Sequence, residues 1–170
     1  VQAGRLAVNG NLGNSVVTVN SGAVLGGNGS VGGINAASGG VVAPGNSVGQ
    51  LNVNGNVNFA QGSVYQVESD AAGNADRIVA TGRATLNNAT VSLVEGGNWV
   101  AASRYSILSA AGGISGTFNN VQSNFAFLTP TLNYTATDVG LTLDRNAQSF
   151  ASLANSRNAR AVAQGLDSAG

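Results

Sequence analysis

The chain has 170 residues, and its seven arginines balance its seven carboxylates, so the formal net charge is zero and only 8% of residues are charged. This balance excludes the basic patch of a nucleic-acid-binding protein and the polybasic run of a lipid-binding one. Glycine and asparagine are abundant beside valine, threonine, isoleucine and leucine, and this mixture favours short strands and tight turns over disorder.

Cysteine, histidine and lysine are absent from the sequence. A chain that must pass unfolded through a narrow pore has a physical reason to lack cysteine, because a disulfide would close a loop too bulky to thread; chance accounts for its absence equally well. No apolar run approaches the ~20 residues of a membrane helix. The chain starts inside a running pattern with no signal peptide, so we expect a segment of a longer protein.

Two phrases recur in the first 65 residues. Residues 6–11 and 51–56 share the pattern Leu-x-Val-Asn-Gly-Asn, and a motif of a small or polar residue, glycine, a small residue and valine stands at 21–24, 38–41 and 61–64. Such imperfect repeats of roughly 20 residues, with short strands and Gly/Asn turns, predict a β-solenoid in which each coil buries its apolar face against the next.

Apolar and polar residues alternate within the expected strands. In 51–53 and 57–59 the outer residues are apolar, and Asn52 and Asn58 lie between them. Alternation with period two places the apolar side chains on one face of a strand, so we expect them inside and the asparagines outside.

From about residue 77 the pattern changes. Strands are expected at 77–80, 84–86 and 90–94, and then 104–118 reads as a hairpin: a first strand with Tyr105, Ile107 and Leu108, a small-residue turn at 110–113, and a second strand that brings in Phe118.

A last hairpin is predicted from 132–134 and 139–143 around the turn 135–138. Trp99 and four further aromatic residues up to Phe127 indicate a thicker core, as expected of a cap that covers the open sheet edge of a solenoid. In 147–168, alanines with apolar residues at helical spacing predict two short helices or one kinked helix.

Three patterns could carry chemistry. Gly45-Asn46-Ser47-Val48-Gly49 matches the Gly-x-Ser-x-Gly nucleophile motif, but its serine needs a base and the chain has no histidine or lysine, so we predict a turn. The carboxylates at 68–76 lack the spacing of a calcium loop, and we predict a polar turn there. No facing pair of carboxylates for glycoside chemistry stands out. Trp99, Tyr105 and Phe118 could form a platform on which a sugar stacks, but aromatic residues of this kind more often fill a core, and we favour that role.

Several phrases in fixed order resemble the C-terminal passenger region of Gram-negative bacterial autotransporters, the type V secretion proteins with a pertactin-like passenger. They lie at 43–49, 51–55, 65–68, 76–82, 105–118, 132–145 and 158–167, and together span nearly the whole chain. The last of them resembles the helical linker that precedes the membrane barrel in that family.

The resemblance implies an all-β fold: a right-handed parallel β-helix with a C-terminal β-hairpin cap and a short helical linker. It divides the chain into the last passenger coils (1–76), an autochaperone cap (77–145) and the linker (146–170). We expect the core of the cap to consist of Tyr105, Ile107, Leu108, Phe118, Leu132 and Leu141.

The function that follows is autochaperone activity, in which the cap nucleates folding of the upstream β-helix during secretion through the outer membrane. The partners implied are the protein's own upstream β-helix and its own C-terminal outer-membrane β-barrel, and the location is the cell surface or, after release, the medium. The alternative is an adhesin or stalk that binds a ligand on host or neighbouring cells. We expect no enzymatic activity, cofactor, metal, nucleic acid or small-molecule substrate.

Overall fold

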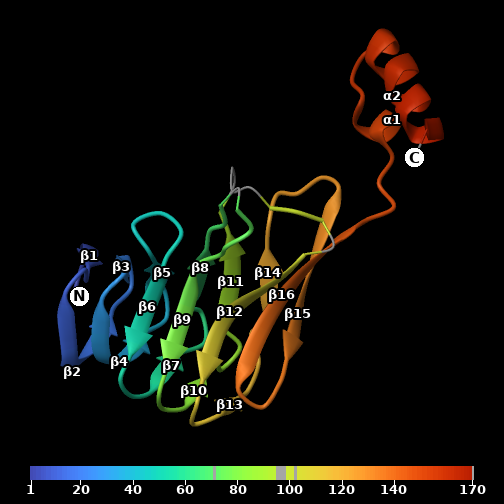
Figure 1. Cartoon of the computed structure of the whole chain (residues 1–170). Coiled ribbons are helices and arrows are strands. Elements are labelled where there is room, and N and C mark those ends of the chain that lie inside the picture. The colour runs from blue at the N-terminus through green and yellow to red at the C-terminus, as the bar shows by residue number, and fades with distance from the viewer. Residues whose placement is uncertain (71, 95–98, 102, 170) are drawn as a thin grey trace.

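The chain is mostly β, with parallel sheets and two helices at its C-terminal end (Figure 1). The computed structural model describes residues 1–70, 72–94, 99–101 and 103–169. One sheet has six strands, in the order β1 (Gly4–Ala7), β3 (Ala23–Gly27), β5 (Val41–Pro44), β8 (Val64–Val67), β11 (Thr90–Leu93) and β14 (Asn120–Gln122).

The second sheet has ten strands and branches at β4 (Ser30–Ala36), which also pairs with β2 (Asn11–Val19). The start of β4 pairs with β6 (Gln50–Val53) and its end with β7 (Val57–Phe59). One branch continues from β6 through β9 (Arg77–Ala80), β12 (Arg104–Ala110) and β16 (Asp138–Arg145) to β15 (Leu128–Tyr134), and the other from β7 through β10 (Ala84–Thr85) to β13 (Ile114–Ser115).

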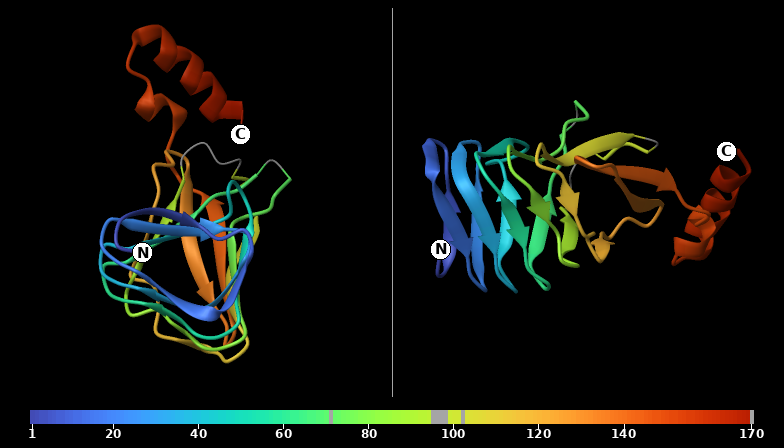
Figure 2. Two further views of the ribbon diagram at one scale, coloured as in Figure 1. Left: turned by 90° about the vertical axis from the view of Figure 1, so that its left-hand side faces the viewer. Right: turned by 90° about the horizontal axis from the view of Figure 1, so that it is seen from below.

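Three successive turns of the chain each contribute one strand to the six-stranded sheet and one strand to each branch of the ten-stranded sheet, so each turn has three faces. These turns are β6–β7–β8, β9–β10–β11 and β12–β13–β14, and each strand pairs in parallel with its counterpart in the next turn. Seen from the end, the turns lie behind one another around a common interior (Figure 2). Parallel pairing continues across the predicted boundary at residue 76.

The motif that recurs at 21–24, 38–41 and 61–64 marks structurally equivalent positions in successive turns. Val24 pairs with Val41, and Val41 with Val64. In the turns before these strands, the amide of Gly22 donates to the carbonyl of Gly39 at 3.0 Å and the amide of Gly39 to that of Gly62 at 2.8 Å. All three glycines have a φ near +75° to +81°, which a side chain disfavours. This stack of left-handed turns explains why glycine recurs there.

The motif shared by residues 6–11 and 51–56 does not mark structurally equivalent positions. Leu6 lies in β1 and pairs with Leu25 in the six-stranded sheet, whereas Leu51 lies in β6 and pairs with Ile78 in the other sheet. The two segments 6–11 and 51–56 therefore have similar sequences because each contains a strand followed by a turn.

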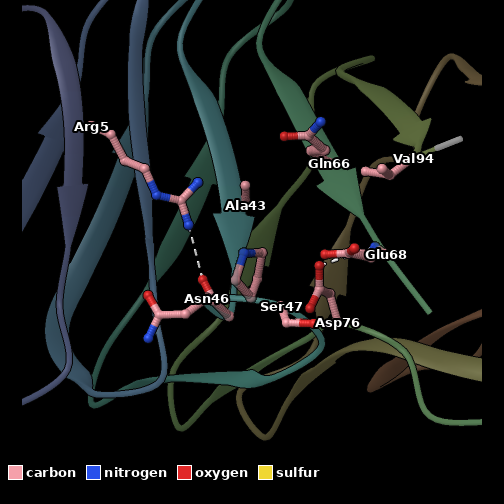
Figure 3. A pocket seen from close by; sticks show the side chains of 10 residues that line it. Arg5, Ala43, Asn46, Ser47, Gln66, Glu68, Asp76 and Val94 are labelled. Carbon is pink, nitrogen blue, oxygen red and sulfur yellow. Dashed lines mark hydrogen bonds between the residues drawn. The ribbon is translucent and has the colours of Figure 1, made fainter. Parts of the chain in front are cut away.

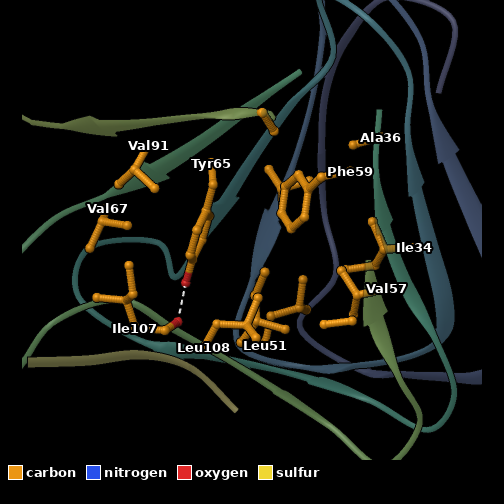
Figure 4. Close-up of a cluster of buried hydrophobic side chains, with 14 of the residues drawn as sticks. Ile34, Ala36, Leu51, Val57, Phe59, Tyr65, Val67, Val91, Ile107 and Leu108 are labelled. Carbon is orange, nitrogen blue, oxygen red and sulfur yellow. Dashed lines mark hydrogen bonds between the residues drawn. The ribbon is translucent and has the colours of Figure 1, made fainter. Parts of the chain in front are cut away.

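The interior consists of in-register rows of apolar side chains (Figure 4). One row contains the fully buried Leu25, Val42, Tyr65 and Val91 of four neighbouring strands. The alternation predicted in the strands is confirmed, since Leu51, Val53, Val57 and Phe59 are all buried. Each such side chain contributes about 1.5–3 kcal/mol when fully buried.

The predicted hairpin at 104–118 is wrong. β12 and β13 do not pair with each other: β12 pairs in parallel with β9, and β13 in parallel with β10. The segment instead turns a corner, with Ala110 beside Ala80 and Ile114 beside Ala84. The previous turn has the same four-residue step between these positions, so the small-residue turn bends the chain from one face to the next and does not reverse it.

The last predicted hairpin is confirmed. β15 and β16 pair antiparallel from Leu128 with Arg145 to Tyr134 with Val139, and the amide of Thr135 donates to the carbonyl of Asp138 at 2.9 Å across the turn. Two helices follow, α1 (Phe150–Leu153) and α2 (Arg157–Ala169), as the alanine-rich pattern predicts. Within the described residues, neither helix has the length and apolar character needed to cross a bilayer.

Replacing Gly62 by alanine tests the stacked turns. Its φ is +81°, and a Cβ would stand 2.6 Å from the Ser38 hydroxyl. We expect the substitution to lower the free energy of unfolding by about 1–2 kcal/mol. Urea titration measures the change. The control is Gly10→Ala, because a Cβ at Gly10 meets no atom within 4 Å; equal stabilities of the two variants would contradict this account.

Candidate functional site

The end of the parallel stack is closed by the β15–β16 hairpin. β12 pairs with β9 along one edge and with β16, antiparallel, along the other, from Arg104 opposite Thr142 to Ser109 opposite Asp138. The hairpin turn also reaches the neighbouring corner, where the carbonyl of Thr137 accepts from the amide of Ala110 at 2.9 Å and that of Ala136 from the amide of Ile114 at 2.8 Å. The hairpin therefore satisfies backbone groups on two faces of the last full turn.

Most of the predicted cap residues lie in the interior. The buried members are Tyr105, Ile107, Leu108, Phe118 and Leu141, and Leu132 is partly buried against the same core. Leu141 lies opposite Tyr105 across β12 and β16, and Leu132 opposite Leu141 across the hairpin. The structure thus brings Tyr105, Leu132 and Leu141 together across β12, β15 and β16, whereas Phe118 lies between β13 and β14 in the same core. The role of these residues in folding remains a prediction.

Trp99, Tyr105 and Phe118 belong to two separate aromatic groups. Phe118 packs on Phe59 and Tyr65, with ring centroids 5.6 Å and 6.0 Å away. Trp99 packs edge-on against Tyr105 at 5.1 Å. Trp99, Tyr105 and Phe118 therefore do not share one surface on which a sugar could stack.

Tyr65, in β8, lies outside the predicted cap but bonds to it, and the sequence patterns did not single it out. It is fully buried, and its hydroxyl donates to the carbonyl of Ile107, where the β12–β16 register shifts by a bulge (Figure 4). Burial raises the pKa of Tyr65 well above its usual value, with a smaller contribution from the negative charge of Asp76, so the phenol keeps its proton. The sequence feature that could have identified Tyr65 is a tyrosine in a row otherwise filled by leucine and valine. A hydroxyl buried in such a row needs a hydrogen-bond partner.

A second tyrosine ties the hairpin to the stack. The hydroxyl of Tyr134, at the end of β15, accepts from the amide of Phe118 at 3.0 Å. Partial burial raises the pKa of Tyr134, and the hydrogen bond from Phe118 opposes this increase. Phe118 is thereby fixed through both its ring and its backbone.

A polar cavity of about 300 Å³ lies beside the base of the 68–76 loop (Figure 3). Asp76 is only 2% exposed; its Oδ1 accepts from the amide of Gly49 at 2.9 Å and its Oδ2 from the amide of Glu68 at 3.0 Å. Burial raises the pKa of Asp76 to about 7 although both hydrogen bonds lower it; the charge of Glu68 adds to the increase and that of Arg5 opposes it.

This cavity also holds the pair of carboxylates that the sequence did not single out. Glu68 and Asp76 both line it because the loop closes on itself, with Ser69 bridged to Ala75. Ser47 lies on the same rim, exposed, in the turn that follows Gly45 with its φ of +86°. The polar side chains that line the cavity with Ser47 are those of Arg5, Asn46, Gln66, Glu68 and Asp76. The turn predicted for the Gly-x-Ser-x-Gly motif is confirmed.

The loop between Asp70 and Asn74 is held by its own hydrogen bonds. Asp70 Oδ1 accepts from the amides of Ala72 and Asn74, and its Oδ2 from the Asn74 side chain, each at 2.9 Å. The bonds from Asn74 lower the pKa of Asp70, so it is ionised at neutral pH. The predicted polar turn is confirmed, and no group of three or more candidate metal ligands gathers within the part of the chain that the structure describes.

Comparison with known proteins gives two relatives from Serratia marcescens, each named extracellular serine protease. The chain is 38% identical to one over 177 residues and 30% identical to the other over 178 residues. Each alignment covers 98% of this chain but 17% of the relative, so the chain spans about a sixth of their length. The name of both relatives agrees with the expected location outside the cell. No family model matches the chain.

Replacing Tyr65 by phenylalanine removes one hydroxyl and leaves the carbonyl of Ile107 without its buried donor. We expect the free energy of unfolding to fall by about 1–3 kcal/mol. Tyr134→Phe should cost less, because Tyr134 is 37% exposed and water can replace its hydroxyl. Chemical denaturation of both variants makes the comparison; a Tyr65→Phe chain as stable as the parent would rule out the role of this hydrogen bond.

Asp76 predicts a pH dependence of stability. Its folded-state pKa, about 7, lies above the ordinary value of 3.8, so the folded chain keeps a proton that the unfolded chain releases. Stability should therefore fall as the pH rises from about 4 to 7 and change little from this group above that range. Asp76→Asn should abolish this slope in unfolding free energies measured between pH 4 and 8.

The control for this measurement is Asp70→Asn. Asp70 has a lowered pKa and so contributes in the opposite direction, by losing stability as the pH falls. The slope assigned to Asp76 should survive in this variant. A slope that persists in Asp76→Asn would assign it to another group.

Proposed function

We propose that this segment is the autochaperone end of an autotransporter passenger, and that its fold is a right-handed parallel β-helix closed by a hairpin cap. Three turns with one strand on each of three faces support the solenoid. The alignment of nearly the whole chain with about a sixth of much longer extracellular proteins supports the assignment to a segment of a secreted passenger.

The observation that carries the proposal is the antiparallel pairing of β16 on β12. A parallel stack can grow by adding strands at an open edge, because each edge strand presents unpaired N–H and C=O groups. An antiparallel hairpin ends that growth at one end. The closed end is then stable early, and the opposite edge remains a template for the turns that precede it in the sequence.

The physical advantage of such a template is kinetic. Parallel pairing joins residues far apart in the chain, so the entropy of loop closure must be spent before contacts compensate it. The β15–β16 hairpin has the shortest connection of any strand pair at this end and forms with little loss of entropy. Once β12 docks on it, each further turn adds to an existing edge, as in repeat proteins with nearest-neighbour coupling.

For the secreted protein, this order of folding fits export with the C-terminal part first. Each added turn outside the membrane releases free energy and opposes return of the chain through the pore. The partners are then the protein's own upstream β-helix and the membrane β-barrel implied by the family resemblance. We assign no protease chemistry to this segment, because a serine nucleophile needs a base and the chain has neither histidine nor lysine.

Two matched leucines test the proposal. Leu141 in β16 and Leu25 in β3 are both fully buried, and they lie at opposite ends of the stack. Alanine at either position should lower the free energy of unfolding by about 2–5 kcal/mol. If the cap folds first, Leu141→Ala slows refolding, whereas Leu25→Ala leaves the refolding rate unchanged and accelerates unfolding.

Stopped-flow refolding and unfolding of the 170-residue chain measure both rates. Ile107, Leu108 and Phe118 should behave like Leu141 when replaced by smaller polar residues, and surface display of the secreted protein should fall in the same order as the refolding rate. Parent-like refolding of Leu141→Ala, together with slow refolding of Leu25→Ala, would reverse the proposed order.

A further inference from the structure

A second cavity lies on the outer surface, beside the strand β12 on which the hairpin docks. Its volume is about 460 Å³, and it is enclosed by the 68–76 loop on one side and by the starts of β6, β9 and β12 on the other. The polar side chains that line it are Gln50, Asp70, Asn74, Arg77, Arg104 and Ser106. A cavity of this volume lies within the range of small-molecule sites.

Two arginines provide positive charge on one wall. Arg77 donates from Nη2 to the hydroxyl of Ser109 at 3.0 Å, while its Nε is buried and has no acceptor among the described residues. The guanidinium of Arg104 lies against Gly140, where a Cβ would stand 3.1 Å from Nε. The hydrogen bond of Arg77 thus goes to a neutral partner, and glycine at position 140 leaves room for the Arg104 side chain.

The opposite wall is suited to hydroxyl groups. Asp70 is ionised and held in place by the amides of its own loop, and Asn74 lies beside it. A carboxylate accepts hydrogen bonds from sugar hydroxyls, and amide side chains both donate and accept. Guanidinium groups, in contrast, bind carboxylates and phosphates through paired N–H donors. The two walls therefore require a ligand that is acidic at one end and rich in hydroxyls at the other.

We propose that this cavity binds an acidic sugar residue, with the acidic group on Arg77 and Arg104 and ring hydroxyls on Asp70 and Asn74. The proposal is independent of the folding role, because none of these four side chains belongs to the cap core. A neutral sugar lacks the partner for the arginines, and a simple anion lacks the partners for Asp70 and Asn74. The acid group of the sugar is a carboxylate or a phosphate, which the experiment separates.

The test is titration of the 170-residue chain with sodium glucuronate, glucose 6-phosphate, glucose and inorganic phosphate, followed by NMR shifts of the Gly73 and Ser106 amides. We expect saturable binding of at least one acidic sugar, and binding of glucose and phosphate at least about tenfold weaker. Arg104→Gln removes one charge from an exposed side chain and should weaken binding of the acidic sugar by about tenfold.

The matched control is Arg83→Gln, since Arg83 is also exposed but does not line the cavity. Its affinity should equal that of the parent. Asp70→Asn should weaken binding of the acidic sugar. In this variant phosphate should still bind no more tightly than the acidic sugar does. The proposal would be overturned by an absence of saturable binding or by parent-like affinity in Arg104→Gln. It would also be overturned if phosphate bound as tightly as the sugar, or if a short peptide bound more tightly through its terminal carboxylate.

Discussion

The structure depends on one constraint: an edge strand in a parallel sheet has unpaired N–H and C=O groups, and something must satisfy them. Along this chain the next parallel turn does so until β12, where β16 pairs antiparallel instead. β15 then becomes the last strand of the sheet, and it contains Pro130, which has no N–H to offer a further strand. The change of strand direction and the proline together end this branch of the ten-stranded sheet.

Closure of the backbone edge is coupled to packing of the interior. The phenol of Tyr65 reaches the carbonyl of Ile107 at the β12 bulge, and the amide of Phe118 reaches the phenol of Tyr134 on the hairpin. Burying these groups without their partners would cost more than the hydrogen bonds themselves contribute. The rings of Phe59, Tyr65 and Phe118 pack against one another, so the hairpin, the last turn and the turn β6–β7–β8 hold one another in place.

Local patterns in the sequence were sufficient for part of this fold. Alternation identified the buried faces of β6 and β7, and glycine at 22, 39 and 62 identified the stacked turns. The corner at 110–113 was misread because Ala-Ala-Gly-Gly suits a reversal as well as a bend. What decides between them is the preceding turn: the pairs Ala80–Ala110 and Ala84–Ile114 keep one spacing on both sides of the corner. Tyr65 and Ile107, 42 residues apart, meet only through that stacking.

The two cavities are linked through adjacent residues at the start of β9. Side chains alternate along an extended chain, so Asp76 faces the first cavity and Arg77 the second. Asp76 fixes the base of the 68–76 loop by accepting from Gly49 and Glu68, and the amide of Asp76 donates to the carbonyl of Glu68 at 2.8 Å. Asp70 and Asn74 belong to the loop that Asp76 anchors, and they line the second cavity together with Arg77. A buried carboxylate that lines the first cavity thus anchors the loop that brings Asp70 and Asn74 to the proposed sugar site.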